Sequence, residues 1–393
     1  MSFPPVVNIN LQQGCGGGEV YTGFFLRALA AGGIASRLLT HPAATAWDTL
    51  APGVPRMSAA TAVAIPERLA VALRGQPPAW LVFHTPCAPA VTAALREQGH
   101  FVSVFAHMPL YGRDPSPLAA CDLVVPVSAH VRDSARAAGL TRVYDAPMYG
   151  IADLRRRPGG DAAALVARTP YDWDRRKVRE RVMGAVEPLL EPLRRRPAFR
   201  RAGGIALGIV SRLTPIKQFP LQFSLLAPVL ARHPVFHLDV FGAGGYTSVR
   251  DLRRALAPIA GRVRFWGHQH DMPAVYAGID YLLTGLPEKE ALGLNVLEAQ
   301  ACGTPVLAVQ APPFTETVRA DVSGLFYADP RTDAGASFEA LLTRLERQPF
   351  RLDGARLEAH LAVFSEAAFA VRVATLAAWV AGRMAGGGGR CDS

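Results

Sequence analysis

Two glutamates that stand eight positions apart are the residues of this 393-residue chain most suited to chemistry. Glu290 lies shortly before Gly293, and Glu298 lies in the apolar, helix-like segment that follows. A helix beginning at Leu294 leaves the N–H groups of Leu294 and Asn295 available to an anion, which the helix dipole also attracts. Ionised carboxylates accept hydrogen bonds from sugar hydroxyls. These residue types therefore favour a ligand with both phosphates and hydroxyls, such as a nucleotide-sugar.

The elements needed to position this segment are a loop, a helix and a buried strand. Gly303 stands where a helix often ends with a glycine, and Pro305 closes the turn. The apolar run Val306–Val309 then has the length and composition of a buried strand. The alternative interpretation is an ordinary amphipathic helix with two surface glutamates.

Two cations follow another predicted strand, the apolar run 204–210. Arg212 and Lys217 stand five positions apart, with Pro215 shaping the turn between them. Paired cations at a strand end are suited to a diphosphate, because they neutralise charge that develops on a leaving group. The alternative is that both are surface cations.

Near the N-terminus, a glycine-rich loop (14–18) joins the strand at 6–11 to a helix from Val20 to about Ala31. It contains Gly17 and Gly18, whose backbone could approach a phosphate or sugar closely; a tight turn is the alternative. His107 follows the strand at 102–105 and is a candidate for positioning a hydroxyl or sharing a proton. A satisfied structural histidine is the equal alternative there.

The run His268-Gln-His-Asp271 has the residue types of a metal site. A third histidine or carboxylate cluster at suitable spacing is missing, so no metal is predicted. Asp271 is a candidate N-cap for a helix at 272–277. The glycines after 241 do not fit a dinucleotide fingerprint, since Thr247 replaces the third glycine and 246–248 is not a clear helix start. No cofactor is expected.

Composition limits the classes of partner that the chain is expected to bind. The net charge of +10 favours polyanions, and no nucleic-acid module motif is present, so phosphorylated substrates or anionic lipids are preferred over nucleic acid. Five scattered cysteines without C-x-x-C spacing favour the cytoplasm. Neither a signal peptide nor a membrane span is expected.

Strand and helix patterns alternate along the chain and predict an α/β fold with doubly wound parallel sheets. The expected domains are 1–160 and 204–363, joined by an Arg-rich linker at 161–203, with a terminal helix at 364–385 and a disordered tail at 386–393. Within the linker, apolar residues recur at helical spacing beneath arginines. A membrane-surface element is one interpretation, and a solvated linker helix is favoured over it.

The segment 290–306 resembles the Glu-x7-Glu signature of family-four retaining glycosyltransferases, the glycosyl transferases group 1 type. Both glutamates and the Ala-Cys-Gly-Thr-Pro-Val tail match, while Ala291, Leu292 and Gln300 depart mildly. The segment 211–217 resembles the family's G-R-L-x-x-x-K-G stretch, with Ser211 and Ile216 as departures. The resemblance is specific between 204 and 327 and loose before 128.

The resemblance implies the GT-B architecture, in which two Rossmann-like domains face an interdomain cleft and the C-terminal helix crosses back to the first domain. It implies catalytic roles for Glu290, His107, Arg212 and Lys217. The donor-binding residues that it implies are Gly17, Gly18, Arg212, Lys217, Gly267, His268, Glu290, Gly293, Leu294, Asn295 and Glu298. Glu298 would hold the ribose, and the loop at 267–271 would line the nucleobase.

The expected function is metal-independent transfer of a sugar from a nucleotide-diphosphate-sugar to a glycan or lipid-linked acceptor, with retention of configuration, in bacterial cell-surface polysaccharide or lipopolysaccharide synthesis. A cytoplasmic protein with a peripheral contact to an anionic membrane fits the charge. Two alternatives stay open: a nucleotide-sugar epimerase on the same fold, and a non-catalytic nucleotide-sugar-binding scaffold.

Overall fold

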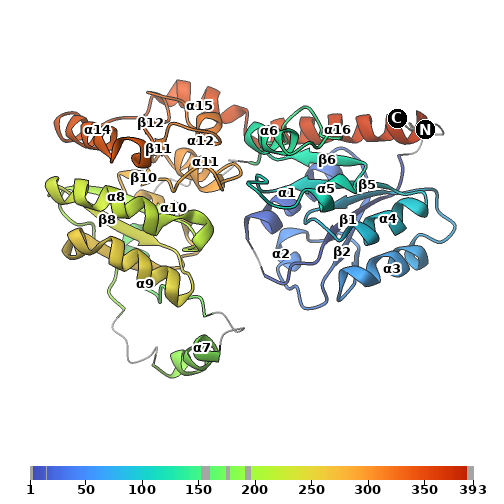
Figure 1. Cartoon of the computed structure of the whole chain (residues 1–393), viewed down its shortest axis with the longest axis horizontal. Coiled ribbons are helices and arrows are strands. Elements are labelled where there is room, and N and C mark those ends of the chain that lie inside the picture. The colour runs from blue at the N-terminus through green and yellow to red at the C-terminus, as the bar shows by residue number, and fades with distance from the viewer. Residues whose placement is uncertain (1–2, 15, 152–159, 174–177, 191–195, 387–393) are drawn as a thin grey trace. The chain divides into compact units, whose positions relative to one another are not determined.

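The computed structural model describes residues 3–14, 16–151, 160–173, 178–190 and 196–386. The chain forms two compact units (Figure 1): Met1–Ala152 together with Ala362–Ser393, and Asp153–Leu361. Each unit is built on one six-stranded sheet. The predicted tail beyond residue 386 lies outside the described residues.

The first unit alternates strands and helices. Its strands are β1 (Val6–Asn10), β2 (Ser36–Thr40), β3 (Arg56–Ser58), β4 (Trp80–Phe83), β5 (Phe101–Ala106) and β6 (Leu123–Pro126). Its helices are α1 (Gly17–Ala31), α2 (Trp47–Leu50), α3 (Ile65–Ala72), α4 (Pro89–Glu97), α5 (Ser116–Ala119), α6 (Ala129–Ala137) and α16 (Glu366–Gly386).

The second unit repeats this plan. Its strands are β7 (Ile205–Val210), β8 (Phe236–Phe241), β9 (Val263–Gly267), β10 (Tyr281–Leu283), β11 (Val306–Val309) and β12 (Gly324–Tyr327). Its helices are α7 (Val178–Leu190), α8 (Phe219–Arg232), α9 (Tyr246–Ala255), α10 (Met272–Ala277), α11 (Leu294–Ala301), α12 (Phe314–Thr317), α13 (Pro330–Asp333), α14 (Ala336–Arg347) and α15 (Gly354–Ala362).

Both sheets are parallel and share one strand order. The first runs β3-β2-β1-β4-β5-β6, and the second, read from its other edge, runs β9-β8-β7-β10-β11-β12. The connections therefore reverse direction between β1 and β4, and again between β7 and β10. In doubly wound sheets the loops diverge at such a reversal and leave a crevice outside the carboxyl ends of the strands, where ligands bind. The predicted α/β fold is confirmed.

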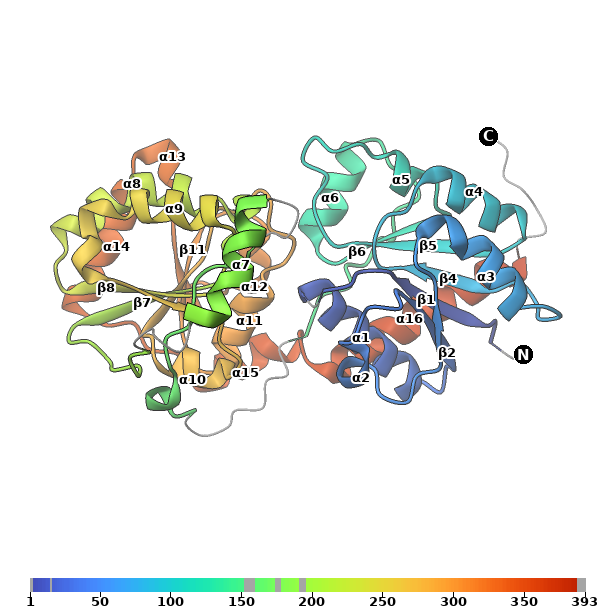
Figure 2. The same cartoon turned by 90° about the horizontal axis from the view of Figure 1, so that it is seen from below.

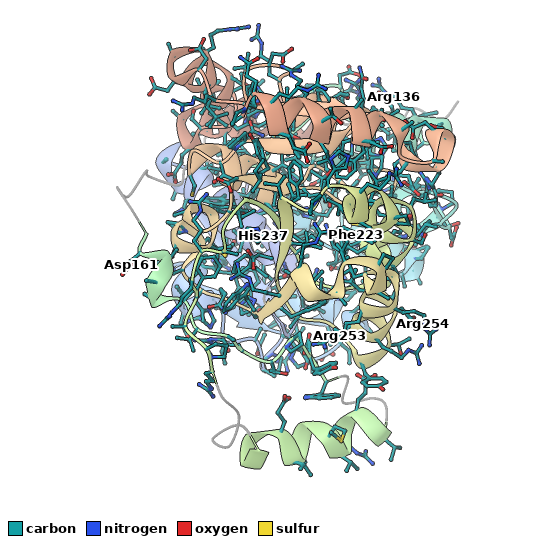
Figure 3. All side chains as sticks on the ribbon, turned by 90° about the vertical axis from the view of Figure 1, so that its left-hand side faces the viewer. Arg136, Asp161, Phe223, His237, Arg253 and Arg254 are labelled. Atoms are coloured by element: carbon teal, nitrogen blue, oxygen red, sulfur yellow. The ribbon has the colours of Figure 1, made fainter. Side chains whose placement is uncertain are left out.

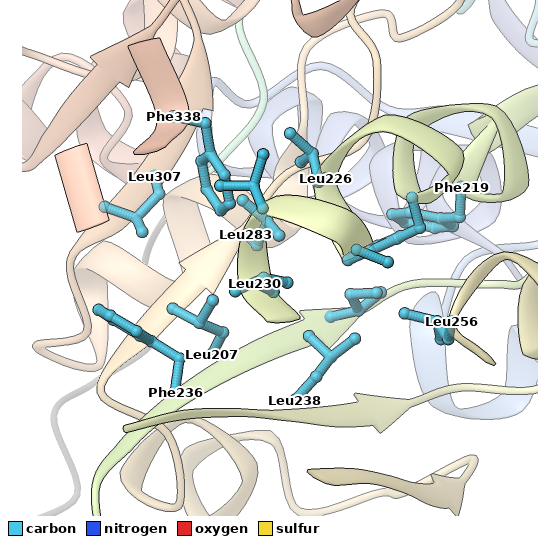
Figure 4. Packing of buried hydrophobic residues seen from close by; sticks show 14 of the residues in the cluster. Leu207, Phe219, Leu226, Leu230, Phe236, Leu238, Leu256, Leu283, Leu307 and Phe338 are labelled. Atoms are coloured by element: carbon cyan, nitrogen blue, oxygen red, sulfur yellow. The ribbon is translucent and has the colours of Figure 1, made fainter. Parts of the chain in front are cut away.

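The second sheet is buried on both faces because its strands carry apolar residues in continuous runs. In β7, Leu207 and Ile209 join the core formed with α8, α9 and α14, part of which is seen in Figure 4. Ala206 and Val210 join the core on the opposite face, with α10, α11 and α12. At Gly208, an added Cβ would lie 2.4 Å from Ile279 Cδ1, so any side chain there would have to displace this isoleucine.

The chain returns to the first unit in α16, which packs against α1 (Figure 2). Its buried residues Phe369, Val373, Leu376, Ala377 and Val380 recur at helical spacing. By length and composition alone, Gly354–Gly386 also satisfies the requirement for a membrane span, which the sequence analysis did not expect. Of the window that meets this requirement, 28% is buried in the structure.

Much of the stretch expected to be a linker packs on the second unit. Val166 and Ala198 form an antiparallel bridge, and Tyr171 forms a parallel bridge with Gly244. Leu165 and Phe199 are buried in the core on the α10 face. The stretch thus contributes to the second unit rather than running freely beside it.

One local prediction was wrong. The sequence around Tyr246 was not expected to open a helix, yet α9 begins there, with Gly245 as its N-cap. The helix is held by Val249 and Leu252, which are buried in the core. Burial of two residues three positions apart outweighs the weak helix propensity of Tyr-Thr-Ser.

Replacing Phe369 with Ala should lower the free energy of unfolding of the first unit by about 3–5 kcal/mol, because the deletion leaves a cavity. Phe369 is fully buried and its ring lies 5.4 Å from that of Tyr21. Val371→Ala on the exposed face of the same helix is the control and should change stability by less than about 0.5 kcal/mol. Denaturant unfolding would measure both; equal effects would show that α16 is not packed by this face.

Candidate functional site

In the second unit, residues predicted to do chemistry lie where the connections of the sheet reverse direction. Arg212 and Lys217 follow β7, and Glu290 follows β10, its neighbour in the sheet. The first turn of α11 lies in the same connection as Glu290. Sequence reasoning named these residues separately, and the pairing of β7 with β10 brings their connections to one edge.

Lys217 is held by a tight turn after β7. Residues Pro215–Lys217 form a single 3₁₀ turn, and Gln218 adopts a left-handed conformation with φ of 55°. Gly285, just past β10, allows this turn to come close, because an added Cβ would lie 2.9 Å from the carbonyl oxygen of Lys217. A glycine in the partner loop thus brings Lys217 to the end of β10.

The loop that carries Glu290 is anchored through Glu288. The Gln218 amide donates to Glu288 Oε1 at 3.1 Å, and Arg331 donates to both Glu288 oxygens at 2.6 and 3.1 Å. Glu288 therefore ties this loop to the β7 turn on one side and to α13 on the other. Sequence reasoning did not single out these three residues, which carry no motif.

Lys217 and Glu290 form an ion pair in which the ammonium donates to Oε2 of the carboxylate. The exposed fractions of the two side chains are 27% and 16%, so solvent screening of the pair is reduced. Arg212 is exposed, and among the described residues its side chain makes no hydrogen bond or ion pair. The structure therefore joins Lys217 to Glu290, whereas Arg212, which follows the same strand, is not joined to either of them by a side-chain contact within the described residues.

Helix α11 begins beside this pair. Its N-cap, Gly293, has φ of 80°, which favours glycine. The Asn295 amide donates to the carbonyl oxygen of Val210 at 2.9 Å, which fixes the helix start to the end of β7. Leu294 and Asn295 are both partly exposed. As first-turn residues they have N–H groups without an intrahelical acceptor, as an anion site requires.

Glu298 lies one turn further along α11, and burial raises its pKa. The Tyr276 hydroxyl lies 3.1 Å from Glu298 Oε2 and 3.1 Å from the Asn295 carbonyl oxygen. Tyr276, from α10, thus orients the carboxylate while desolvation opposes its charge. Tyr276 could not be recognised from its sequence context, because a tyrosine in an apolar helix is usually a core residue.

Gly267 and His268 lie at the end of β9. Gly267 has φ of 66°, and an added Cβ would lie 2.4 Å from the Thr169 carbonyl oxygen, so packing explains this glycine. His268 is exposed, with its ring 4.9 Å from that of His270. Asp271 accepts from the Ala274 N–H at 3.1 Å, which confirms its predicted role as an N-cap. Within the described ranges, no cluster of three or more His, Cys, Asp or Glu could hold a metal.

In the first unit, the glycine loop follows β1, again at the reversal of the sheet. Gly17 and Gly18 are the first two residues of α1, and an added Cβ on Gly18 would meet no atom within 4 Å. Glu19 accepts from the Gly16 N–H at 2.8 Å and from the Asn10 amide at 3.4 Å. Packing therefore does not explain why residue 18 is a glycine. Asn10 and Glu19 hold the loop in place, and sequence reasoning missed both.

His107 follows β5 and belongs to an aromatic cluster. Its ring lies 4.9 Å from Tyr21 and 6.1 Å from His84. Burial lowers the pKa of His107 to about 4, so the imidazole is neutral at physiological pH. Its Nε2 is buried without a hydrogen-bond partner in the described part of the chain. His84 contacts Asn8 Oδ1 at 3.1 Å through Nε2, and its Nδ1 is likewise buried without a partner among the described residues.

Comparison with known proteins relates part of the chain to a protein family. Residues 195–353 match the glycosyl transferases group 1 family, and this range contains the site of the second unit. The match covers less than half of the chain, so the similarity to this family is a property of residues 195–353. The resemblance noted at 211–217 and 290–306 is confirmed for this region.

Two relatives illustrate the match. The D-inositol 3-phosphate glycosyltransferase of Rhodococcus opacus is 31% identical over 194 residues, which are 44% of this chain and 42% of that protein. The GDP-mannose-dependent monoacylated alpha-(1-6)-phosphatidylinositol monomannoside mannosyltransferase of Corynebacterium glutamicum is 34% identical over 116 residues, 28% of this chain and 30% of that protein. The chain thus covers less than half of the length of either relative.

Solved structures resemble the whole chain. HepE of Anabaena in complex with UDP has a TM-score of 0.67 at 16% identity, covering 95% of this chain and 100% of that one. Sucrose-phosphate synthase of Thermosynechococcus elongatus has a TM-score of 0.67 at 17% identity, covering 96% and 99%. The fold is that of the GT-B glycosyltransferases, as predicted.

Replacing Glu298 with Gln should stabilise the protein at neutral pH. Because the folded pKa of Glu298 is raised, the wild type loses stability as pH rises from the ordinary carboxyl pKa of about 4.3 through the folded pKa. The melting temperature of the Gln variant should exceed that of wild type at pH 7.5, and the gap should vanish near pH 4. Glu97→Gln, at an exposed site, is the control and should show no such trend. A gap that widens toward acid would contradict the assignment.

Proposed function

We propose that the protein is a metal-independent, retaining glycosyltransferase that moves a sugar from a nucleotide-diphosphate-sugar to an acceptor hydroxyl. The observation that carries the proposal is the Lys217–Glu290 pair beside the N-terminus of α11, at the reversal of a sheet whose sequence matches the glycosyl transferases group 1 family. That arrangement places a cation, a carboxylate and helix N–H groups together, which suits a diphosphate joined to a sugar.

In this proposal the second unit binds the donor. Lys217, Arg212 and the N–H groups of Leu294 and Asn295 hold the diphosphate, helped by the backbone at Gly293. As the bond between sugar and diphosphate breaks, the leaving oxygen gains negative charge, which these groups stabilise. Exposed Arg212 has no side-chain partner in the described part of the chain that it would have to release before contacting a phosphate.

The carboxylates take the hydroxyl-bearing parts of the donor. Glu290 accepts from the transferred sugar, and Glu298 accepts from the ribose while Tyr276 orients it. His268 is exposed, unlike the neighbouring Gly267, and is the proposed contact to the nucleobase. HepE was crystallised with UDP and with UDP-glucose, which makes uridine donors the first to test.

The proposal also assigns roles to residues of the first unit, taken by itself. Gly17 and Gly18 are the proposed contacts to a phosphate or sugar, since no described atom lies within 4 Å of a Cβ added at Gly18. His107, neutral because burial lowers its pKa to about 4, donates or accepts a hydrogen bond through Nε2 rather than carrying charge. It positions a hydroxyl in this proposal.

The proposed acceptor is a glycan or a lipid-linked glycan in bacterial cell-surface polysaccharide or lipopolysaccharide synthesis. The protein would act in the cytoplasm, with peripheral contact to an anionic membrane, which its net charge of +10 supports. The relatives from Rhodococcus and Corynebacterium act by name on inositol-containing acceptors, which makes these compounds reasonable first acceptors.

The test of this function is release of nucleoside diphosphate from a panel of nucleotide-sugars. Release that depends on acceptor supports the transferase. A change of the sugar without any acceptor would instead identify an epimerase. Binding of nucleotide-sugar, seen as a rise in melting temperature, without turnover on any acceptor pool would identify a non-catalytic scaffold.

Replacing Lys217 with Ala should lower the affinity for nucleoside diphosphate about tenfold or more, because a charge-assisted contact is lost and Glu290 keeps its charge beside the phosphates. The double variant Lys217→Ala with Glu290→Gln removes that repulsion and should bind several-fold more tightly than Lys217→Ala alone. Turnover of Lys217→Ala should fall about a hundredfold. Titration calorimetry measures the affinities.

Lys289→Ala, in the same loop as Glu290, is the control and should bind nucleoside diphosphate like the wild type. Losses that simply multiply in the double variant would show that Lys217 and Glu290 do not act on the same part of the ligand.

A further inference from the structure

Helix α7 (Val178–Leu190) places its side chains in the reverse of the usual order. Its glutamates, Glu180 and Glu187, are buried, with exposed fractions of 5% and 8%. Its apolar residues Val178, Val182 and Val186 are exposed by 67%, 55% and 37%. A surface helix normally buries its apolar stripe and exposes its charges. The exposed valines recur every four residues and therefore form one stripe.

The orientation of α7 is fixed by contacts on its acidic side. The Trp173 indole N–H donates to Glu187, and Trp173 stacks on Tyr171 with ring centroids 4.8 Å apart. Gly184 faces this tryptophan, since an added Cβ would lie 3.1 Å from the Trp173 Cβ. A glycine in a helix interior costs about 1 kcal/mol. Here it admits the tryptophan that turns the valines outward.

The acidic side also approaches the body of the second unit. A Cβ added at Gly245, the N-cap of α9, would lie 3.6 Å from Glu180 Oε2, so this carboxylate lies at the positive end of the α9 dipole. Figure 3 shows α7 on the side of the unit at which Arg253 and Arg254 of α9 lie. With Glu180 and Glu187 turned inward, the outward side of α7 carries exposed Arg181 and the apolar stripe.

The charge of the surrounding stretch favours an anionic partner. Between Arg168 and Arg201 the sequence has eleven basic and five acidic residues, which supplies more than half of the net charge of +10. An apolar stripe on a helix within a basic stretch is the combination that binds the interface of an anionic bilayer. A second copy of the chain would carry the same positive charge, which disfavours self-association through this face.

We infer that α7 is the membrane-docking element of this protein, with Val178, Val182, Met183 and Val186 entering the interface of an anionic lipid surface. Most of the stretch that carries the helix lies outside the 195–353 match to the glycosyl transferases group 1 family. The inference rests on the proposed peripheral contact and names the element that makes it. It requires no catalytic activity, so its test stands apart from that of sugar transfer.

The experiment is co-sedimentation of the full chain with vesicles containing about 30% phosphatidylglycerol in phosphatidylcholine. Wild type should bind these vesicles, and binding to pure phosphatidylcholine should be at least tenfold weaker. Val182→Asp with Val186→Asp should reduce binding to the anionic vesicles at least tenfold. Val186→Trp should increase binding, because tryptophan favours the membrane interface. Opposite effects from two substitutions in one stripe cannot both arise from unfolding.

Val63→Asp with Val71→Asp is the matched control, since both valines are exposed, by 81% and 64%, on the first unit. It makes the same change in net charge and should leave vesicle binding within about twofold of wild type. Equal loss in both double variants would show that net charge alone drives binding, and absence of wild-type binding would remove the peripheral contact itself; either result overturns the inference. Self-association that is lost only in the α7 variant, in the ultracentrifuge and without lipid, would assign the face to a second copy.

Discussion

The ion pair between Lys217 and Glu290 is the contact on which the site of the second unit depends. It joins residues 73 positions apart in the chain, one following β7 and the other following β10. A partly desolvated pair has a marginal net energy, because desolvation offsets most of the attraction. Its effect is to keep two opposite charges in place, and in the proposed function a diphosphate contacts the ammonium and a hydroxyl contacts the carboxylate.

The residues around the pair also help to keep the two charges in place. Gly285 lets the β7 turn approach, Glu288 ties the two loops together, and Asn295 fixes the start of α11 to the end of β7. Each contact costs little by itself, yet together they reduce the movement needed on binding. Glu298 differs from these residues, because its position lowers stability. Burial raises the pKa of its carboxyl group, so the charged form is disfavoured in the folded protein.

The sequence predicted the elements around the candidate site well where they have a regular pattern. Strands such as Val306–Val309 were located correctly because buried parallel strands are continuous apolar runs, and Gly303 and Asp271 were recognised as helix-end residues. Two short strands, β2 and β3, were not predicted, because three to five residues of mixed polarity show no hydrophobic periodicity. Tyr276 and Glu288 were missed because their importance comes from partners that are distant in sequence.

The stretch at 161–203 shows why composition alone could not decide its role. Its arginines and valines favoured a solvated linker over a membrane-surface helix without excluding the latter, because both have charges and apolar residues at helical spacing. What separates the two is the direction in which each face points, and that is set by tertiary contacts. Trp173 can lie against the helix only where Gly184 leaves room, and its indole then holds Glu187 on the inner side. With that side fixed, the valines have no place but the outside. A helix that only linked two units would gain stability by turning the other way, so the contacts that prevent this favour a role for the exposed apolar face.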